Sequence, residues 1–217
     1  MSNTATLNIL GFLILVSCTS SVKPQDNKYF EGRIMYKNEF IFKTNQVDSN
    51  SIIKFFGKTA DLYFKDGNYV EKYDGGDMLE QLYRKQDNKV YVKRNQSDTL
   101  FWTDCGRPGK SILRFEINHA KETILGIVCD ELITYYETKT VSFYFNPDTL
   151  KINSDWYSAF TITNKNINTQ KMKSMFLKYK IEYPNFVATV TATSILPQKI
   201  DDNVFSISKN RILIEDK

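Results

Sequence analysis

Apolar and polar residues alternate along most of the chain, which is the spacing that places one face of a β-strand in a core. The stretch YFEGRIMYKNEFIF (residues 29–42) is the first example, and Val90 and Val92 alternate with Tyr91 and Lys93 further on. Successive side chains of a strand point to opposite faces. One of these two faces should therefore meet a core, and the other should face water or a shallow groove.

Short polar segments separate these runs. Asp66-Gly67 tolerates the positive φ angles of a tight hairpin turn, and residues 86–88, 95–98 and 137–139 carry similar turn chemistry. The pattern predicts three longer strands in the runs SILRFEINH, ETILGIVCDELITYYE and KTVSFYFNPDTLKI. It also predicts a strand in NFVATVTATSIL and a short last one in NVFSI, with the tail RILIEDK left ambiguous.

One segment has helical spacing. In TQKMKSMFLKYKIEYP (residues 169–184), Met172, Met175, Phe176 and Tyr179 recur at the period of one helix face, and Pro184 follows the end. Such a helix packs on the sheet, or it forms a movable lid over a cavity, for which flexible methionines would suit varied apolar ligands.

The expected fold class follows from these elements. We predict a mainly β (α+β) domain over residues 29–217, built as a curved antiparallel sheet or half-barrel. One or two helices should pack on or cover its concave face. The residues that combine apolar area with a place at such a cover are the predicted ligand-binding positions: Trp156, Met172, Met175 and Phe176. The alternative is ordinary core packing of these aromatic and apolar residues.

The N-terminus has the pattern of an export signal. The run from Leu7 to Val16 has the length of a signal-peptide apolar region and is too short to span a bilayer as a helix. Leu15-Val16-Ser17-Cys18 resembles the bacterial lipobox, so residues 1–17 are predicted to be a lipoprotein signal peptide and Cys18 the lipid anchor. Residues 18–28 would form a polar tether. The alternative is a buried N-terminal element with an ordinary free cysteine.

Composition narrows the function classes. The chain is 14% aromatic and 41% hydrophobic, which indicates a packed fold. Its net charge of +4 comes from Lys and Arg interspersed with Asp and Glu, which argues against a nucleic-acid partner. Outside the cytoplasm, Cys105 and Cys129 could form one disulfide or remain two buried thiols.

Catalytic and metal motifs are weak. His119 is the single histidine, which excludes a histidine-rich metal site and leaves one candidate base, expected to be exposed. The loop 106–111 resembles a phosphate loop but has Asp104 where the pattern needs glycine. The acidic turn 74–77 lacks the spaced ligands of an EF-hand. We therefore expect no metal, no cofactor and no enzymatic activity.

The order of features resembles a family. The first strand, the stretch KETILGIVCDELITYY, the following YFNPDTLKI and the closing VATVTATSILPQKIDDNVFSI are similar to bacterial envelope lipoproteins of the GLPGLI type. Gly126 and Cys129 in T-I-L-G-x-x-C are the most distinctive match. The resemblance implies a lipoprotein-carrier (LolA/LolB-like) half-barrel with an apolar concavity.

The expected function follows from the anchor and the resemblance together. We expect a non-enzymatic lipoprotein of the bacterial outer membrane that faces the periplasm and holds a hydrophobic or amphipathic ligand. The alternative is a protein-interaction or structural module of the envelope with a filled core and no ligand. In both cases the membrane is a partner through the lipid anchor, and the further partner is a hydrophobic ligand or an envelope protein.

Overall fold

The computed structural model describes residues 28–45 and 47–216, so the predicted signal peptide and the anchor Cys18 lie outside the described residues. Twelve strands form a single sheet. They are β1 (Gly32–Phe42), β2 (Thr59–Lys65), β3 (Asn68–Tyr73), β4 (Met78–Arg84), β5 (Lys89–Arg94), β6 (Thr99–Asp104), β7 (Arg114–Ile124), β8 (Ile127–Tyr135), β9 (Thr140–Phe145), β10 (Phe176–Glu182), β11 (Phe186–Pro197) and β12 (Ile212–Glu215).

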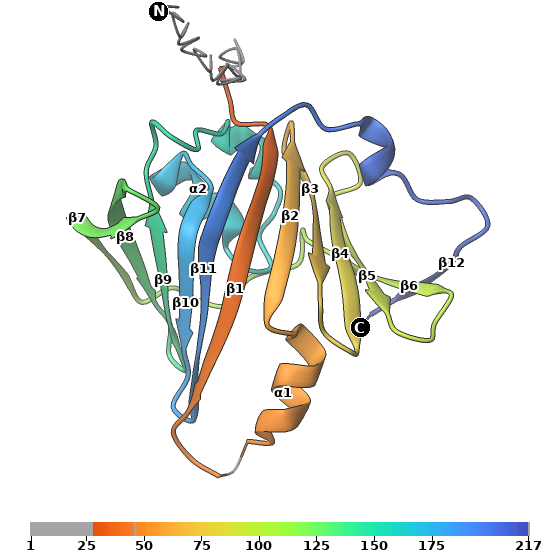
Figure 1. Ribbon diagram of the computed structural model, residues 1–217, viewed down its shortest axis with the longest axis horizontal. Helices are drawn as coiled ribbons and strands as arrows, with labels where there is room; N and C mark the ends of the chain where they lie inside the picture. Colours follow the sequence, from red (N-terminus) through yellow and green to blue (C-terminus); the bar gives the residue numbers. More distant parts are fainter. Residues whose placement is uncertain (1–27, 46, 217) are drawn as a thin grey trace, which may run out of the picture.

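The sheet is curved and open. Its strand order is β12-β6-β5-β4-β3-β2-β1-β11-β10-β9-β8-β7, and β12 and β7 form the two free edges at opposite sides of the molecule (Figure 1). Neighbouring strands are antiparallel, except that β12 runs parallel to β6. The predicted fold class, a mainly β domain with a curved antiparallel sheet that does not close into a barrel, is confirmed.

Four short helical elements complete the fold. They are α1 (Ser49–Phe56), the 3-10 helix η1 (Ser154–Tyr157), α2 (Lys165–Met172) and the 3-10 helix η2 (Asp202–Phe205). The helix α1 projects at one end of the sheet (Figure 1). It begins there because the Asp48 side chain accepts hydrogen bonds from the backbone N–H groups of Asn50 and Ser51. No described helix has the length and apolarity needed to cross a membrane.

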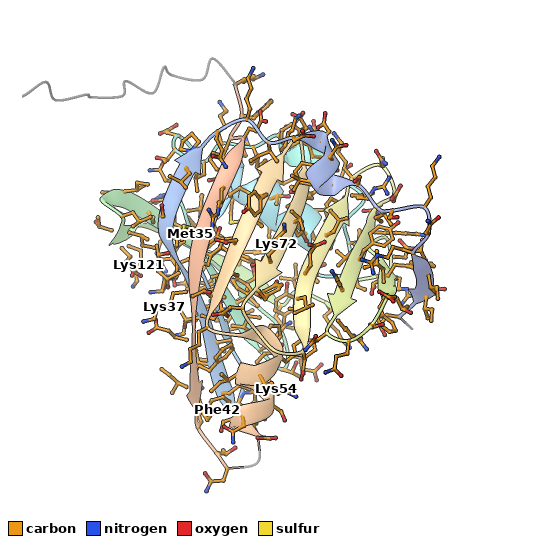
Figure 2. The ribbon with its side chains drawn as sticks, turned by 45° about the vertical axis from the view of Figure 1, so that its right-hand side comes forward. Met35, Lys37, Phe42, Lys54, Lys72 and Lys121 are labelled. Carbon is orange, nitrogen blue, oxygen red and sulfur yellow. The ribbon has the colours of Figure 1, made fainter. Side chains whose placement is uncertain are left out.

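Strand alternation gives the sheet two different faces. On the concave face, Ile34, Tyr36, Leu62, Phe64 and other fully buried side chains form the main core with the segment between β9 and β10. On the outer face, a smaller cluster around Val70 and Leu82 packs under η2. Figure 2 labels Met35 and Lys37, which alternate along β1 with Ile34 and Tyr36 of the main core.

The predicted hairpin turns are confirmed. Asp66 and Gly67 both have positive φ and join β2 to β3, as their sequence predicts. The run ETILGIVCDELITYYE was predicted as one strand and is wrong in that respect. Leu125 and Gly126 both have positive φ, so the chain turns there and separates β7 from β8.

The predicted helix over residues 169–184 is largely wrong. The helix α2 ends at Met172 because Lys173 adopts the left-handed conformation at φ 52°, and β10 follows. Within β10, Leu177, Tyr179 and Ile181 alternate with lysines, and the strand pairs with both β9 and β11. The hydrogen bonds of β10 to both neighbouring strands favour a strand over a helix here. The helical spacing arose by coincidence, because its residues belong to two different elements.

The C-terminal predictions also need correction. Residues 203–207 do not form a strand, because the Asp201 side chain accepts the N–H of Asn203 and starts η2 there. The ambiguous tail instead supplies β12. It pairs with β6 through Ile212 and Leu213, which remain 60% and 47% exposed at this free edge.

The two turn glycines provide a matched stability test. A Cβ at Gly67 would lie 2.7 Å from the Trp156 Cβ, whereas a Cβ at Gly126 meets nothing within 4 Å. Both have positive φ, so Gly126→Ala should cost only the backbone strain, about 1 kcal/mol. Gly67→Ala should cost about 1 kcal/mol more in urea unfolding, because it adds the clash with Trp156. Equal losses of unfolding free energy in the two variants would show that the Trp156 side chain moves aside without cost.

Candidate functional site: a cavity beneath the β9–β10 connection

A cavity of about 480 Å³ lies between the concave face of the sheet and the connection formed by residues 146–175, which includes η1 and α2. Its floor is a cross-strand row from β2 to β5. Leu62 pairs with Glu71, Glu71 with Gln81, and Gln81 with Val92. Because paired residues of a sheet share a face, all four line the cavity. The floor is therefore apolar at both ends and polar in the middle.

The far wall and the cover are mostly apolar. The strands β9 and β10 contribute aromatic and branched side chains, and α2 with its flanking turns covers the opening from the other side. These lining residues are Val141, Phe143, Phe176 and Tyr179 on the wall, and Phe160, Ile162, Lys165, Asn168, Thr169, Met172 and Met175 on the cover. A site of this volume and character lies in the range of small-molecule pockets, about 300–1,000 Å³.

Hydrogen bonds tie the connection to the opposite half of the sheet. The backbone N–H groups of Thr161 and Ile162 donate to the Cys105 carbonyl at 2.7 and 3.0 Å, just after β6. The Asn164 side chain donates to the Lys110 carbonyl at 2.7 Å. At its base, the Ser174 hydroxyl lies 2.9 Å from the Asn146 carbonyl. The connection is thus fixed at its base and near its middle, and it spans the concave face as a strap.

The main polar group of the cavity is the ammonium of Lys165, the first residue of α2. Its Nζ lies 4.5 Å from the ring centre of Tyr69, 4.7 Å from that of Tyr157 and 5.6 Å from that of Phe160. Aromatic faces attract a cation, but they replace only part of its hydration. Burial therefore lowers the pKa of Lys165 to about 8, and the charge of Glu71 opposes this shift only in part.

Glu71 is the acidic group of the same cavity. Its Oε2 accepts a hydrogen bond from the Tyr73 hydroxyl at 2.7 Å. Burial raises the pKa of Glu71, while the Tyr73 bond and the charge of Lys165 act against that rise. No ion pair joins Glu71 to Lys165 among the residues that the structure describes. The two groups sense each other's charge without forming a salt bridge.

Cys105 supplies a thiol to the cavity lining. It is 1% exposed, and burial raises its pKa to about 12. A thiol with this pKa stays protonated at neutral pH and is a poor nucleophile. Cys105 therefore acts here as a small apolar residue.

The predicted ligand-binding residues are only partly brought together. Met172, Met175 and Phe176 line the cavity, although they come from the end of α2, the following turn and β10 rather than from one helix face. Trp156 is not among the lining residues. It packs on Tyr29 and Phe64 and against the hairpin turn at Gly67.

Of the two alternatives for Cys105 and Cys129, a disulfide or two buried thiols, the structure has the second. Both cysteines are free and buried. Cys105 follows β6 near one edge of the sheet, and Cys129 belongs to β8 near the other, as Figure 1 shows for the two strands. Strands so far apart in the sheet order do not bring the two sulfur atoms within bonding geometry.

The other motif residues have structural partners. His119 is exposed, as predicted, and its Nδ1 lies 2.9 Å from Asp130. The Asp74 carboxylate accepts the backbone N–H groups of Lys58 and Thr59 after α1. Within residues 28–45 and 47–216, no three His, Cys, Asp or Glu side chains are grouped to hold a metal ion.

Sequence reasoning missed Lys165 and Glu71. Both lie in segments rich in charged and polar residues, where a single lysine or glutamate looks like any surface residue. One signal was available for Glu71: in NYVEKY it holds the same alternate position as the buried Tyr69 and the partly buried Tyr73. For Lys165 no comparable signal exists, since the position of α2 under the sheet is a property of the whole fold.

No protein-family model matches the sequence, and no curated protein matches it. The resemblance to GLPGLI-type lipoproteins therefore stays a prediction. Among solved structures, PNGF-II in its C2 crystal form is similar with a TM-score of 0.48 and 16% identity, covering 86% of this chain and 31% of that one. The chain thus spans about a third of the length of PNGF-II.

A second solved structure with similarity is the lipoprotein LppX of Mycobacterium tuberculosis. The TM-score is 0.36 and the identity 10%, over 79% of this chain and 89% of that one. At these scores neither structure supports an inference about ligand, activity or partner.

Proposed function

We propose that the protein is a non-enzymatic binding protein that holds a hydrophobic or amphipathic ligand in the cavity beneath the β9–β10 connection. The observation that carries this proposal is the cavity itself. About 480 Å³ remains open in the middle of the concave face, where the main core of the domain would otherwise continue. A filled core would leave no such volume, because protein interiors are close-packed.

The floor and the cover of the cavity are both held in place by hydrogen bonds. Its floor is a hydrogen-bonded sheet, and its cover is fixed by backbone and side-chain bonds to the residues after β6. A preformed apolar site loses little conformational entropy when a ligand enters. The residues in contact with the ligand would be Val92, Phe143, Met172, Met175 and Phe176, which supply most of its apolar surface.

The location is part of the same proposal. Lipidation at Cys18 would anchor the domain to the outer membrane through a polar tether, facing the periplasm, where amphipathic molecules are present. The proposal draws on the lipobox pattern and the apolar run before it. Mass spectrometry of the envelope-extracted chain would identify a diacylglyceryl group on Cys18, and an unmodified residue there would contradict the anchor.

Native mass spectrometry tests the binding function. The protein purified from its host envelope and stripped of detergent should carry an adduct with the mass of a lipid or similar amphipathic molecule. The same spectrum should show both Cys105 and Cys129 as free thiols. A bare chain that takes up no added fatty acid or phospholipid would contradict a binding role and favour the interaction module.

A further inference from the structure

We propose that the ligand carries one acidic headgroup on an apolar chain, and that an anionic oxygen of this headgroup binds the ammonium of Lys165. This inference rests on the proposed function of the cavity and adds the chemical class of the ligand. A carboxylate or a phosphate monoester on an alkyl chain would both fit, since they share the anionic oxygen.

The first support is the lack of an anionic partner for Lys165. The three aromatic rings contact its Nζ, but no carboxylate lies at ion-pair distance among the described residues. Lys165 is partly buried, and a lysine ammonium held against aromatic rings without a paired charge is uncommon. An anion in the cavity would supply the missing partner with a charge-assisted hydrogen bond.

The second support is the charge balance of the lining. Lys110, Lys139 and Lys165 contribute three positive charges, and Glu71 contributes one acidic group. Glu71 is already engaged by the Tyr73 hydroxyl. A ligand anion therefore enters a cavity whose lining is net positive, and a cationic ligand would be repelled from it.

The third support is the path left for the chain of the ligand. Beyond the α2 start, the lining continues through Met172, Met175 and Phe176 to Val141 and Phe143, all of them apolar. Alkyl groups gain about 0.8 kcal/mol for each buried CH₂ group, so this stretch favours an apolar tail over a second polar group. The polar start and the apolar continuation match an amphiphile with its head at Lys165.

The titration of Lys165 predicts a pH dependence. The groups that face it are Glu71 of β3, the Cys105 thiol after β6, and the hydroxyls of Tyr69 and Tyr157, whose pKa values burial raises. Lys165 itself loses its proton near pH 8 in the empty protein. Above that pH, affinity for an anion should fall about tenfold per pH unit, because binding must first restore the proton.

A displacement assay separates the headgroup from the tail. The neutral fluorophore N-phenyl-1-naphthylamine is bound to the purified chain at pH 7 and displaced by dodecanoate or by 1-dodecanol, which differ in charge. Dodecanoate should compete at least about tenfold better, the value of one hydrogen bond to a charged group. Lys165→Met should remove this preference, while Lys171→Met, a change of an exposed lysine on the same helix, should keep it.

The outcomes of this assay test the acidic headgroup separately from ligand binding in the cavity. If acid and alcohol compete equally with the wild-type protein, or if Lys165→Met keeps the preference, the acidic headgroup is excluded and the apolar site stands. If neither the fluorophore nor either ligand binds, the site itself is excluded. The pH profile of wild-type affinity needs no variant: a decline above pH 8 for dodecanoate but not for dodecanol supports Lys165, and parallel profiles contradict it.

Discussion

Replacing Lys165 with methionine should raise the free energy of unfolding by about 2 kcal/mol at pH 7. Burial lowers the pKa of Lys165 to about 8 from its ordinary value of 10.5, so the folded state holds its proton less well than the unfolded state. This difference corresponds to about 3 kcal/mol, and solvent in the cavity reduces it. Methionine has a similar length and packs favourably against aromatic rings.

The increase in unfolding free energy of Lys165→Met should also depend on pH. Between pH 8 and pH 10.5 the unfolded wild-type chain binds more protons than the folded one, so wild-type stability rises with pH across this window. Below pH 8 the full penalty is present. The advantage of Lys165→Met should therefore be largest below pH 8 and shrink toward zero near pH 10.5.

Urea unfolding of the wild type, Lys165→Met and Lys171→Met at several pH values measures this effect. Lys171→Met is the control, because its ammonium lies over Phe115 at an exposed position. A destabilised Lys165→Met at pH 7 would show that Lys165 is compensated inside the empty protein, with Glu71 as the partner. A stabilised variant that has lost acid binding would instead show a lysine kept for ligand recognition at the expense of stability.

The strand content and most turns could be predicted from the sequence because they depend on local chemistry. Asp66-Gly67 forms its hairpin because both residues accept positive φ. Alternation separates Val90, which lines the cavity, from Tyr91, which is buried on the outer face. The helical stripe misled because Met172 and Phe176 share a cavity without sharing an element. Spacing along the chain cannot separate one helix face from two adjacent segments that fold against the same space.

The site could be predicted only in its apolar part. Met172, Met175 and Phe176 are in the cavity as expected, but its polar centre depends on contacts between β3 and the start of α2, far apart in sequence. The choice between a disulfide and two free thiols has the same origin. Cys105 and Cys129 form an even pair by count, yet the strand order places them near opposite edges of the sheet. The polar centre of the cavity and the state of the two cysteines both depend on which distant segments of the chain meet in the fold.

Filling the cavity should abolish ligand binding. Val92 lines the cavity floor and belongs to none of the buried core clusters, so Val92→Trp places an indole in open volume rather than in packed atoms. Affinity for N-phenyl-1-naphthylamine and for dodecanoate should fall about 100-fold, since a ligand would have to displace the new ring. The melting temperature should change little.

The binding cavity is therefore tested most sharply by a titration of N-phenyl-1-naphthylamine into the wild type, Val92→Trp and Val128→Trp. Val128 is the matched control, because it is 53% exposed on β8 and lies outside the cavity lining. We expect saturable binding to the wild type and to Val128→Trp, and loss of binding in a folded Val92→Trp. Unchanged binding to Val92→Trp, or loss in Val128→Trp, would place the ligand elsewhere on the protein and contradict the cavity as its site.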